Sequence, residues 1–258
     1  MAKRNQVGLP SWALALLAAL LLTGAWLMKL FPVFLFAGFA PLFALIQRSN
    51  KKDFNLQSVE WIFLVLLISY ATAHLFEMSL LVRAAWQGIL LTTPFIAYRF
   101  SRHYLGERLG LLPLIFFWLA VEYLILKFDA SGRSVFLADA LALKQEWYHW
   151  TIHTGYLGVS AWLLICNVIL YYAVFQQKLN VYLLVLFALA ITVPLVISYV
   201  QAEEGVTRQA MLSLYHHMQS KMYPHLYQER GEVAARTSAW VSVLILLFAL
   251  VKFKTKRK

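Results

Sequence analysis

The sequence contains a single cysteine and few acidic residues. Cys166 lies inside an apolar run, so the chain offers neither a disulfide bond nor a Cys-x-x-Cys metal site. Aspartate and glutamate together number 12, against 23 lysines and arginines, and the net charge is +11. A glycine-rich phosphate loop, an internal repeat and a low-complexity run are also missing. These absences exclude a disulfide-stabilised domain, a P-loop nucleotide-binding protein and a repeat solenoid.

Apolar residues, in contrast, are abundant. Hydrophobic side chains make up 61% of the chain and aromatic ones 16%, whereas about 45–50% of a typical soluble domain is apolar. The composition therefore predicts a membrane protein. The basic residues cluster at the ends of apolar segments, which is typical of a multi-pass protein, so the positive charge does not indicate a nucleic-acid partner. No motif predicts a cofactor.

Apolar runs bounded by charged or turn residues predict an all-α bundle of about eight transmembrane spans. The predicted spans are 11–30, 31–47, 58–81, 84–100, 109–127, 155–175, 181–200 and 236–253. The second and fourth are short and contain Pro32, Pro41 and Pro94, so we expect kinks or incomplete crossings there. An even number of spans places both termini on one side, and the distribution of lysine and arginine predicts that this side is cytoplasmic.

Residues 1–258 are thus expected to form one membrane domain with two long non-cytoplasmic segments, 128–154 and 201–235. The second segment contains Met211, Tyr215, Met218 and Met222, whose spacing predicts one face of a helix. Pro224 should end that helix. Extramembrane chemistry, if any, belongs to these two segments.

The order of several short motifs resembles a known family. The stretches that carry the resemblance are LLTTPFIAYRFSRHYLGERLGLLPLIFFWLAVEYLILKFDAS (90–131) and LADALALKQEWYHWTIHTGYLGVSAWLLICNVILYY (137–172). Their landmarks include Pro94-Phe95, Leu105-Gly106, Trp118, Glu122-Tyr123-Leu124, Asp129, Trp147, Thr154-Gly155, Gly158, Ser160, Trp162 and Asn167. In this order they resemble the membrane domain of bacterial apolipoprotein N-acyltransferases, particularly of the Bacteroidetes type, over about 30–200 and 231–258. The resemblance implies a multi-pass protein of the bacterial inner membrane.

The chain departs from that family where the catalytic domain should be. The family carries a nitrilase-like domain with a Glu-Lys-Cys triad between its last two spans, but segment 201–235 is far shorter than the ~50 residues of even a small domain. Cys166 lies within a predicted span, where it is expected to be inert. Glu-Lys-Cys chemistry is therefore not expected. The resemblance implies a lipid- or lipoprotein-binding scaffold, or a subunit of a membrane complex, with membrane lipids and lipoproteins as partners.

An enzyme is the alternative to a scaffold, because several ionisable residues fall within the predicted spans. His74 and Glu77 share a helix face in the outer half of the third span, and Glu122 lies in the outer half of the fifth. Ionisable groups at this depth are costly and are candidates for function. Arg83 lies close enough to the outer interface to meet a headgroup. These residues form either a satisfied structural network or a polar pocket for a lipid headgroup, a peptide or a proton.

The stretch QEWYHWTIHTG (145–155) is a second candidate site. Glu146, His149 and His153 fall on one helix face and could bind zinc, or the histidines could join His74 and Glu77 in the acid–base work of an acyl or lipid transferase. Trp147 and Trp150 instead favour an interfacial aromatic belt that contacts lipid.

Two further groups of polar residues favour structural roles. His216-His217 and His225 in the last long segment are expected on a solvated face rather than around a metal. Ser160, Trp162 and Asn167 are most simply helix-packing residues, and Asn167 can donate hydrogen bonds across helices.

Overall fold

The protein is all-helical in the part of the chain that its computed structural model describes. The described residues are 9–28, 32–48, 57–74, 78–106, 110–128, 134–141, 144, 147, 149–152, 154–176, 179–202 and 225–256. They form α1 (Ser11–Leu27), η1 (Pro32–Phe34), α2 (Leu35–Gly38), α3 (Ala40–Arg48), α4 (Gln57–Ala73), α5 (Met78–Leu105), α6 (Leu112–Phe128), η2 (Leu137–Leu141), η4 (His149–Ile152), α7 (Leu157–Val174), α8 (Val181–Ala202) and α10 (His225–Lys256).

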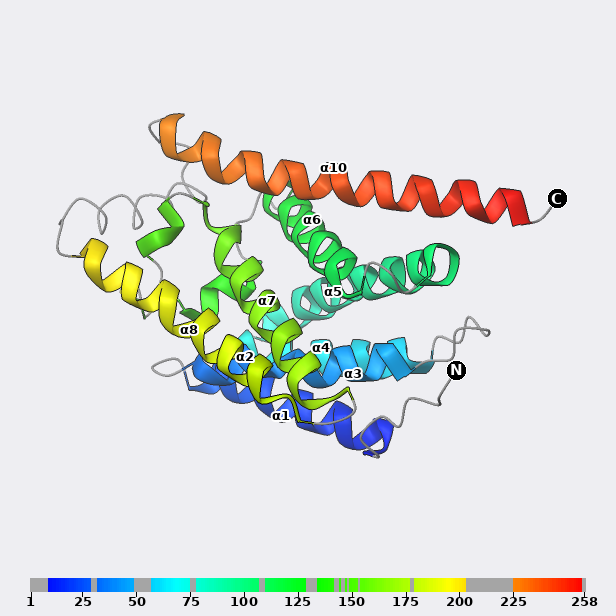
Figure 1. Ribbon diagram of the computed structural model, residues 1–258, viewed down its shortest axis with the longest axis horizontal. Coiled ribbons are helices and arrows are strands. Elements are labelled where there is room, and N and C mark those ends of the chain that lie inside the picture. The colour runs from blue at the N-terminus through cyan, green and yellow to red at the C-terminus, as the bar shows by residue number, and fades with distance from the viewer. Residues whose placement is uncertain are drawn as a thin grey trace.

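The order of the helices matches the predicted spans when the broken stretch from η1 to α3 is counted as one. Three helices, α7, α8 and α10, are long and apolar enough to cross a membrane. The start of α1 and the end of α10 both lie at the right-hand end of the molecule in Figure 1. The start of the first described helix and the end of the last therefore lie on the same side of the bundle.

The boundaries of three predicted spans differ clearly from the structure. The sequence places one span at 58–81, but α4 ends at Ala73 and Met78 already belongs to α5. The sequence places a span at 84–100, but α5 runs from Met78 to Leu105 without interruption. Arg83 and Arg102 end the apolar run without ending the helix: Arg83 is exposed to the surroundings, and Arg102 reaches backbone carbonyls of α3. Similarly, α10 begins at His225, directly after Pro224, rather than at residue 236.

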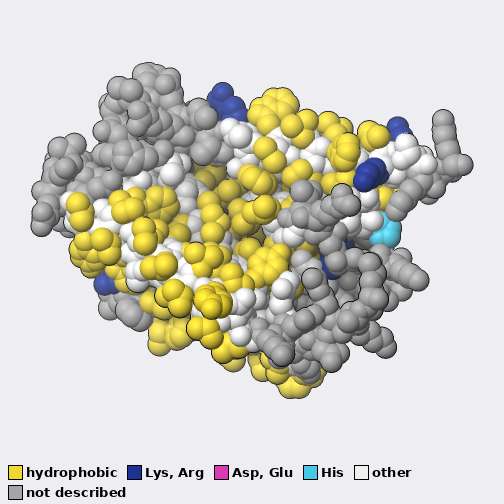
Figure 2. Space-filling view, in the orientation of Figure 1, with side chains coloured by type: hydrophobic (Ala, Val, Ile, Leu, Met, Phe, Trp, Pro, Cys, Tyr) yellow, Lys and Arg dark blue, Asp and Glu magenta, His cyan; other side chains and the backbone are white. Residues whose placement is uncertain are grey.

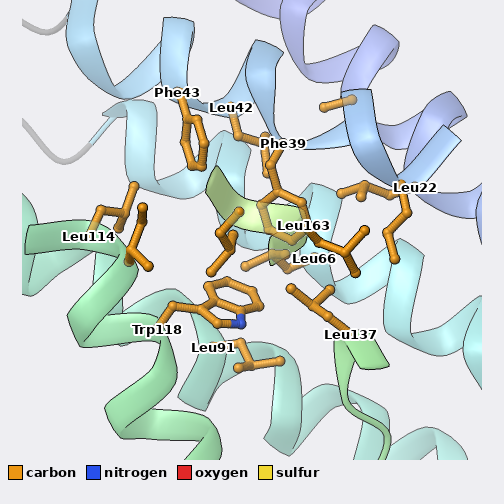
Figure 3. Packing of buried hydrophobic residues seen from close by; sticks show 14 of the residues in the cluster. Leu22, Phe39, Leu42, Phe43, Leu66, Leu91, Leu114, Trp118, Leu137 and Leu163 are labelled. Atoms are coloured by element: carbon orange, nitrogen blue, oxygen red, sulfur yellow. The ribbon is translucent and has the colours of Figure 1, made fainter. Parts of the chain in front are cut away.

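Trp118 of α6 lies at the centre of the hydrophobic core. Phe39 and Phe95 pack edge-on against its indole ring, with ring centroids 5.0 Å and 6.1 Å away. Figure 3 shows Leu163 and Leu91 on opposite sides of the ring, so helices from both halves of the chain meet there. Each fully buried side chain of this size contributes about 1.5–3 kcal/mol relative to exposure to water.

The break between α2 and α3 is closed by a side chain from α7. The Asn167 Oδ1 atom accepts hydrogen bonds from the backbone N–H groups of Phe39 (2.8 Å) and Ala40 (3.0 Å). Its Nδ2 atom donates to the carbonyls of Leu35 and Leu163, both at 2.8 Å. In a continuous helix the Phe39 N–H would donate to the Leu35 carbonyl, and the Asn167 amide bridges these two groups instead. The predicted hydrogen bonding of Asn167 across helices is confirmed.

Two prolines inside helices are accommodated in a similar way. Pro94 in α5 and Pro194 in α8 lack the N–H that would bind the carbonyl four residues earlier. The Thr93 hydroxyl donates to the carbonyl of Leu90 at 2.6 Å. The Trp162 Nε1–H of α7 donates to the carbonyl of Ala190 at 2.6 Å. Both freed acceptors are thus satisfied, and α5 and α8 continue through their prolines.

Helices α8 and α10 expose apolar side chains. In the most apolar 18 residues of each helix, only 6% are buried in α8 and 17% in α10. Figure 1 shows α10 lying across α6 and α5, with its end extending past them. Hydrophobic side chains dominate the visible face in Figure 2. Such surfaces are compatible with a hydrocarbon environment.

Candidate functional site

Glu122 of α6 is fully buried in the bundle, and its two carboxylate oxygens differ in their surroundings. Its Oε1 atom accepts the backbone N–H of Leu137 at 3.2 Å. Its Oε2 atom has no hydrogen-bond partner in the described part of the chain. The side chains of Ser160 and Trp118 interact with this carboxylate. However, neither the Ser160 Oγ atom nor the Trp118 Nε1 atom lies at good hydrogen-bond geometry to any described group. A buried acceptor and two buried hydrogen-bonding groups therefore lie together.

Trp118 and Leu137 both belong to the hydrophobic core shown in Figure 3. Leu137 is also the residue whose N–H binds Glu122. Ser160 approaches from α7 and is itself fully buried. We refer to Trp118, Glu122 and Ser160 as the Glu122 cluster.

The segment 134–141 covers the Glu122 cluster and is held by three helices. The Gln87 amide of α5 accepts the N–H of Val135 at 3.2 Å through Oε1 and donates to the Val135 carbonyl through Nε2. Asp139 accepts the N–H of Phe136 at 2.7 Å and the hydroxyl of Tyr156. Together with the bond from Leu137 to Glu122, these contacts fix an irregular stretch whose backbone would otherwise be costly to bury.

Asp139 is the titratable group of this cover. Burial raises the pKa of its carboxyl from the ordinary value of 3.8 to about 6, although the hydrogen bonds from Phe136 and Tyr156 oppose that rise. The charge of this carboxyl therefore changes near neutral pH. Because its two hydrogen-bond donors belong to the cover and to Tyr156, the residue directly before α7, protonation alters the contact that joins the cover to α7.

His74 lies at the end of α4, near the same cluster. It is 6% exposed, and its backbone N–H donates to the carbonyl of Tyr70 at 3.1 Å. Tyr70 interacts electrostatically with both Glu122 and Asp139, which brings the last turns of α4 to the cluster. Glu77, predicted to share a face with His74, lies outside the described residues. Arg83 is exposed on α5, one turn before Gln87.

His149 belongs to a different packing environment. It is 4% exposed and lies in η4, which packs against α8. Trp150 contacts the ring of Trp162 edge-on at 5.7 Å, and its backbone N–H donates to the Ser198 hydroxyl at 3.5 Å. Trp147 is half-buried beneath the Lys144 ammonium, 6.0 Å from the ring centroid. Trp150 therefore packs on α7, which the prediction of a lipid-facing belt did not foresee.

The structure describes only one of the three residues of the predicted zinc site, His149. Glu146 and His153 lie outside the described residues. Within the described ranges, no three His, Cys, Asp or Glu side chains are placed to hold a metal ion. Cys166 is buried in α7. Of the His216-His217 and His225 group, only the backbone of His225 is described, as the first residue of α10.

Two residues of this region were not singled out from the sequence: Gln87 and Asp139. Gln87 and Asp139 each interrupt an apolar stretch, which is the signal that could have marked them. Their partners are distant in sequence, so the pairing itself needed the structure. No known protein family matches the chain, and neither does any curated protein or solved structure.

Proposed function

We propose that the protein is a multi-pass protein of the bacterial inner membrane, with about eight spans and both termini in the cytoplasm. The exposed apolar surfaces of α8 and α10 support insertion in a bilayer. The positive charge at the ends of the apolar segments supports the orientation. The approach of α1 and α10 to one end of the bundle is compatible with an even number of crossings.

In that membrane the protein acts as a lipid- or lipoprotein-binding scaffold, or as a subunit of a membrane complex, without the catalytic triad of the N-acyltransferases that its sequence resembles. The observation that carries this proposal is the fully buried Glu122 carboxylate, whose Oε2 atom meets no donor at good hydrogen-bond geometry although Ser160 and Trp118 both interact with the carboxylate. A buried acceptor without a donor is unfavourable by about 1–3 kcal/mol, and more if it is charged. A ligand that supplies an N–H or O–H group would remove that cost.

The chemistry of the cluster defines the ligand class. A carboxylate accepts hydrogen bonds from an ammonium, an amide or a hydroxyl group, while the Trp118 N–H donates to an oxygen of the same ligand. Such groups occur together in an aminophospholipid headgroup and at the amino terminus of a lipoprotein. The cover 134–141 must move to admit one, and the donor of the ligand then binds the Oε2 atom, while the Leu137 N–H keeps its bond to Oε1.

The Glu122→Gln variant tests this proposal. Glutamine keeps an oxygen for the Leu137 N–H but replaces the second carboxylate oxygen with a donor, so binding should fall at least tenfold while the fold is retained. The measurement is mass spectrometry of lipids and lipopeptides that co-purify in mild detergent. Glu60→Gln, the same change at an exposed position on α4, is the matched control. Equal retention of amine-bearing lipids by the two variants would contradict the proposal.

A second candidate function, a membrane-embedded acyl or lipid transferase, is favoured by the position of Ser160 beside Glu122. A serine hydroxyl next to a carboxylate can be activated as a nucleophile, and the Trp118 N–H could stabilise an oxyanion. In the form expected from the sequence, His74, Glu77, His149 and His153 perform the acid–base work. Transfer of a labelled acyl chain from phospholipid to a diacylated lipopeptide should then be lost in Ser160→Ala or His149→Ala, with folding unchanged. The absence of any transfer by the wild-type protein would favour the scaffold.

A further inference from the structure

Tyr70 of α4 carries a buried hydroxyl group that the proposed function does not use. Its side chain is 1% exposed, and the hydroxyl has no hydrogen-bond partner in the described part of the chain. The ring packs against Trp26 of α1, with centroids 5.9 Å apart. The Trp26 Nε1–H itself donates to the Ser69 hydroxyl at 3.0 Å, so it does not complete Tyr70. A buried hydroxyl in this state destabilises the fold unless another group binds it.

The Tyr70 hydroxyl lies near two carboxylates. It interacts electrostatically with Glu122 of α6 and with Asp139 of the cover, and these two carboxylates also interact with each other. Three polar groups from three separate elements are therefore within electrostatic reach of one another. Figure 3 shows the same arrangement of the elements: Leu66, one turn before Tyr70, lies in one core with Leu137, whose N–H binds Glu122.

The charges around this hydroxyl favour a cationic ligand. Among the described residues, the charged groups that act on Tyr70 are Glu122 and Asp139, and both are acidic. When both carboxyl groups are ionised they repel each other, and the repulsion is strong because the interior screens charge poorly. A neutral amide or hydroxyl group of a ligand would form hydrogen bonds here but would leave that repulsion in place. A positively charged group would form the hydrogen bonds and remove the repulsion as well.

We propose that Tyr70 is a ligand-binding residue of the site at Glu122, and that this site selects a primary ammonium group. Such a group has three N–H bonds, so it can donate to the Glu122 Oε2 atom and to the Tyr70 hydroxyl at the same time. A trimethylammonium group carries the charge without an N–H, and a glycerol headgroup offers O–H groups without the charge. The inference rests on the ligand site proposed above, and it adds the charge of the ligand and a further residue that contacts it.

The selectivity is tested by titrating the full-length protein, freed of co-purified lipid in detergent, with three dioleoyl lipids. These are phosphatidylethanolamine, phosphatidylcholine and phosphatidylglycerol, and thermal stabilisation reports binding. Phosphatidylethanolamine should bind about tenfold more tightly than the other two. A diacylated lipopeptide with a free or an acetylated amino terminus is the peptide arm, and the tighter of the two amines identifies the source of the ammonium group. Equal binding of the three lipids, with no loss on acetylation of the lipopeptide, would overturn the proposal.

The role of Tyr70 is tested by Tyr70→Phe, which removes the hydroxyl and keeps the ring against Trp26. The affinity for the preferred amine should fall about tenfold, or about 1.4 kcal/mol, because a hydrogen bond to its charged group is lost. The affinity for phosphatidylcholine should change less than about threefold. Without ligand, the variant should be at least as stable as the wild-type protein, with a melting temperature about 2–4 °C higher, since an unpartnered buried hydroxyl is gone.

The matched control is Tyr98→Phe, the same change at a buried tyrosine of α5 whose hydroxyl is fully engaged. Tyr98 is 2% exposed; its hydroxyl accepts the Gln47 amide at 2.5 Å and donates to the Gly110 carbonyl at 3.1 Å. This variant should have a lower melting temperature and an unchanged affinity for the amine. A Tyr70→Phe variant that behaves in the same way would show that the hydroxyl is structural, and would overturn the proposal.

The outcome also separates this inference from the proposed function. If Glu122→Gln loses the amine-bearing ligand and Tyr70→Phe keeps it, the role of Tyr70 is refuted while the ligand site at Glu122 stands. If neither variant changes the binding of any of the probes, the proposed function fails together with the inference. Loss of binding in both variants, with Tyr98→Phe unaffected, is the expected result.

Discussion

Replacement of Asn167 by leucine should be among the most destabilising single substitutions in the bundle. Leucine has a similar volume, so the change removes hydrogen bonds without opening a large cavity. Three backbone groups lose their side-chain partner: the N–H groups of Phe39 and Ala40 and the carbonyl of Leu35. At about 1 kcal/mol each, the low end of the range for a buried unsatisfied group, the loss is about 3 kcal/mol. Even the smaller average for polar contacts in membrane helices, ~0.6 kcal/mol per bond, gives about 2 kcal/mol over four bonds.

The assay is equilibrium unfolding in mixed micelles, followed by circular dichroism as the fraction of denaturing detergent rises. Asn180→Leu is the matched control because Asn180 makes a similar contact at an exposed position. Its Oδ1 atom accepts the N–H groups of Tyr182 and Leu183 at the start of α8, at 3.1 Å and 3.3 Å, and loss of such a cap costs about 1 kcal/mol. If Asn167→Leu were no less stable than Asn180→Leu, the bridge would not be a major stabilising contact.

Two other predictions concern α8 and the cover. Trp162→Phe should lower the free energy of unfolding by about 1–2 kcal/mol because the Ala190 carbonyl loses its donor. In a Pro194→Ala background the restored backbone N–H should supply that donor, so a double-mutant cycle should give a coupling energy of about 1 kcal/mol. Additive effects of the two substitutions would refute the pairing. Asp139 binds its proton more tightly in the folded state, with a pKa of about 6 against 3.8, so its contribution to stability is full below pH 3.8 and is lost as pH rises through 6. The loss of stability is at most about 3 kcal/mol. The unfolding free energy of Asp139→Asn, measured between pH 4 and 7, should lack this pH dependence. A pH dependence equal to that of the wild-type protein would contradict the assignment of the effect to Asp139.

The sequence predicted an all-α fold and the order of the described helices because apolar runs mark them directly; three of these helices are long and apolar enough to cross a membrane. It did not predict their ends. Arg83 stops the apolar pattern of α5 but is exposed, so the helix extends past it to Met78. Pro32 and Pro41 did indicate a broken second segment, and the break is observed. What hydropathy cannot supply is the partner that repairs the break, because Asn167 is 128 residues from Phe39.

The candidate site, too, was predicted only in part from the sequence. Glu122 was predicted from its cost at membrane depth, and it is buried. The side chains that surround it, Ser160 and Trp118, are ordinary core residues by pattern, and the sequence analysis assigned Ser160 a packing role. Only the packing of α6 against α7 brings Ser160 to the carboxylate. A pair contact of this kind depends on the rotation of two helices, which a single sequence does not specify.

The amide bridge at Asn167 has a consequence for biosynthesis. Leu35 and Asn167 are separated by 132 residues, which a ribosome takes roughly ten seconds to synthesise. In the membrane placement proposed above, the interrupted turn before α3 enters the bilayer during that interval, where unpaired backbone groups are costly, and its permanent partner does not yet exist. The early helices must therefore wait in a provisional arrangement, shielded by water, the insertion machinery or a chaperone, until α7 arrives. Insertion of α7 is then the event that commits the first helices to their final positions.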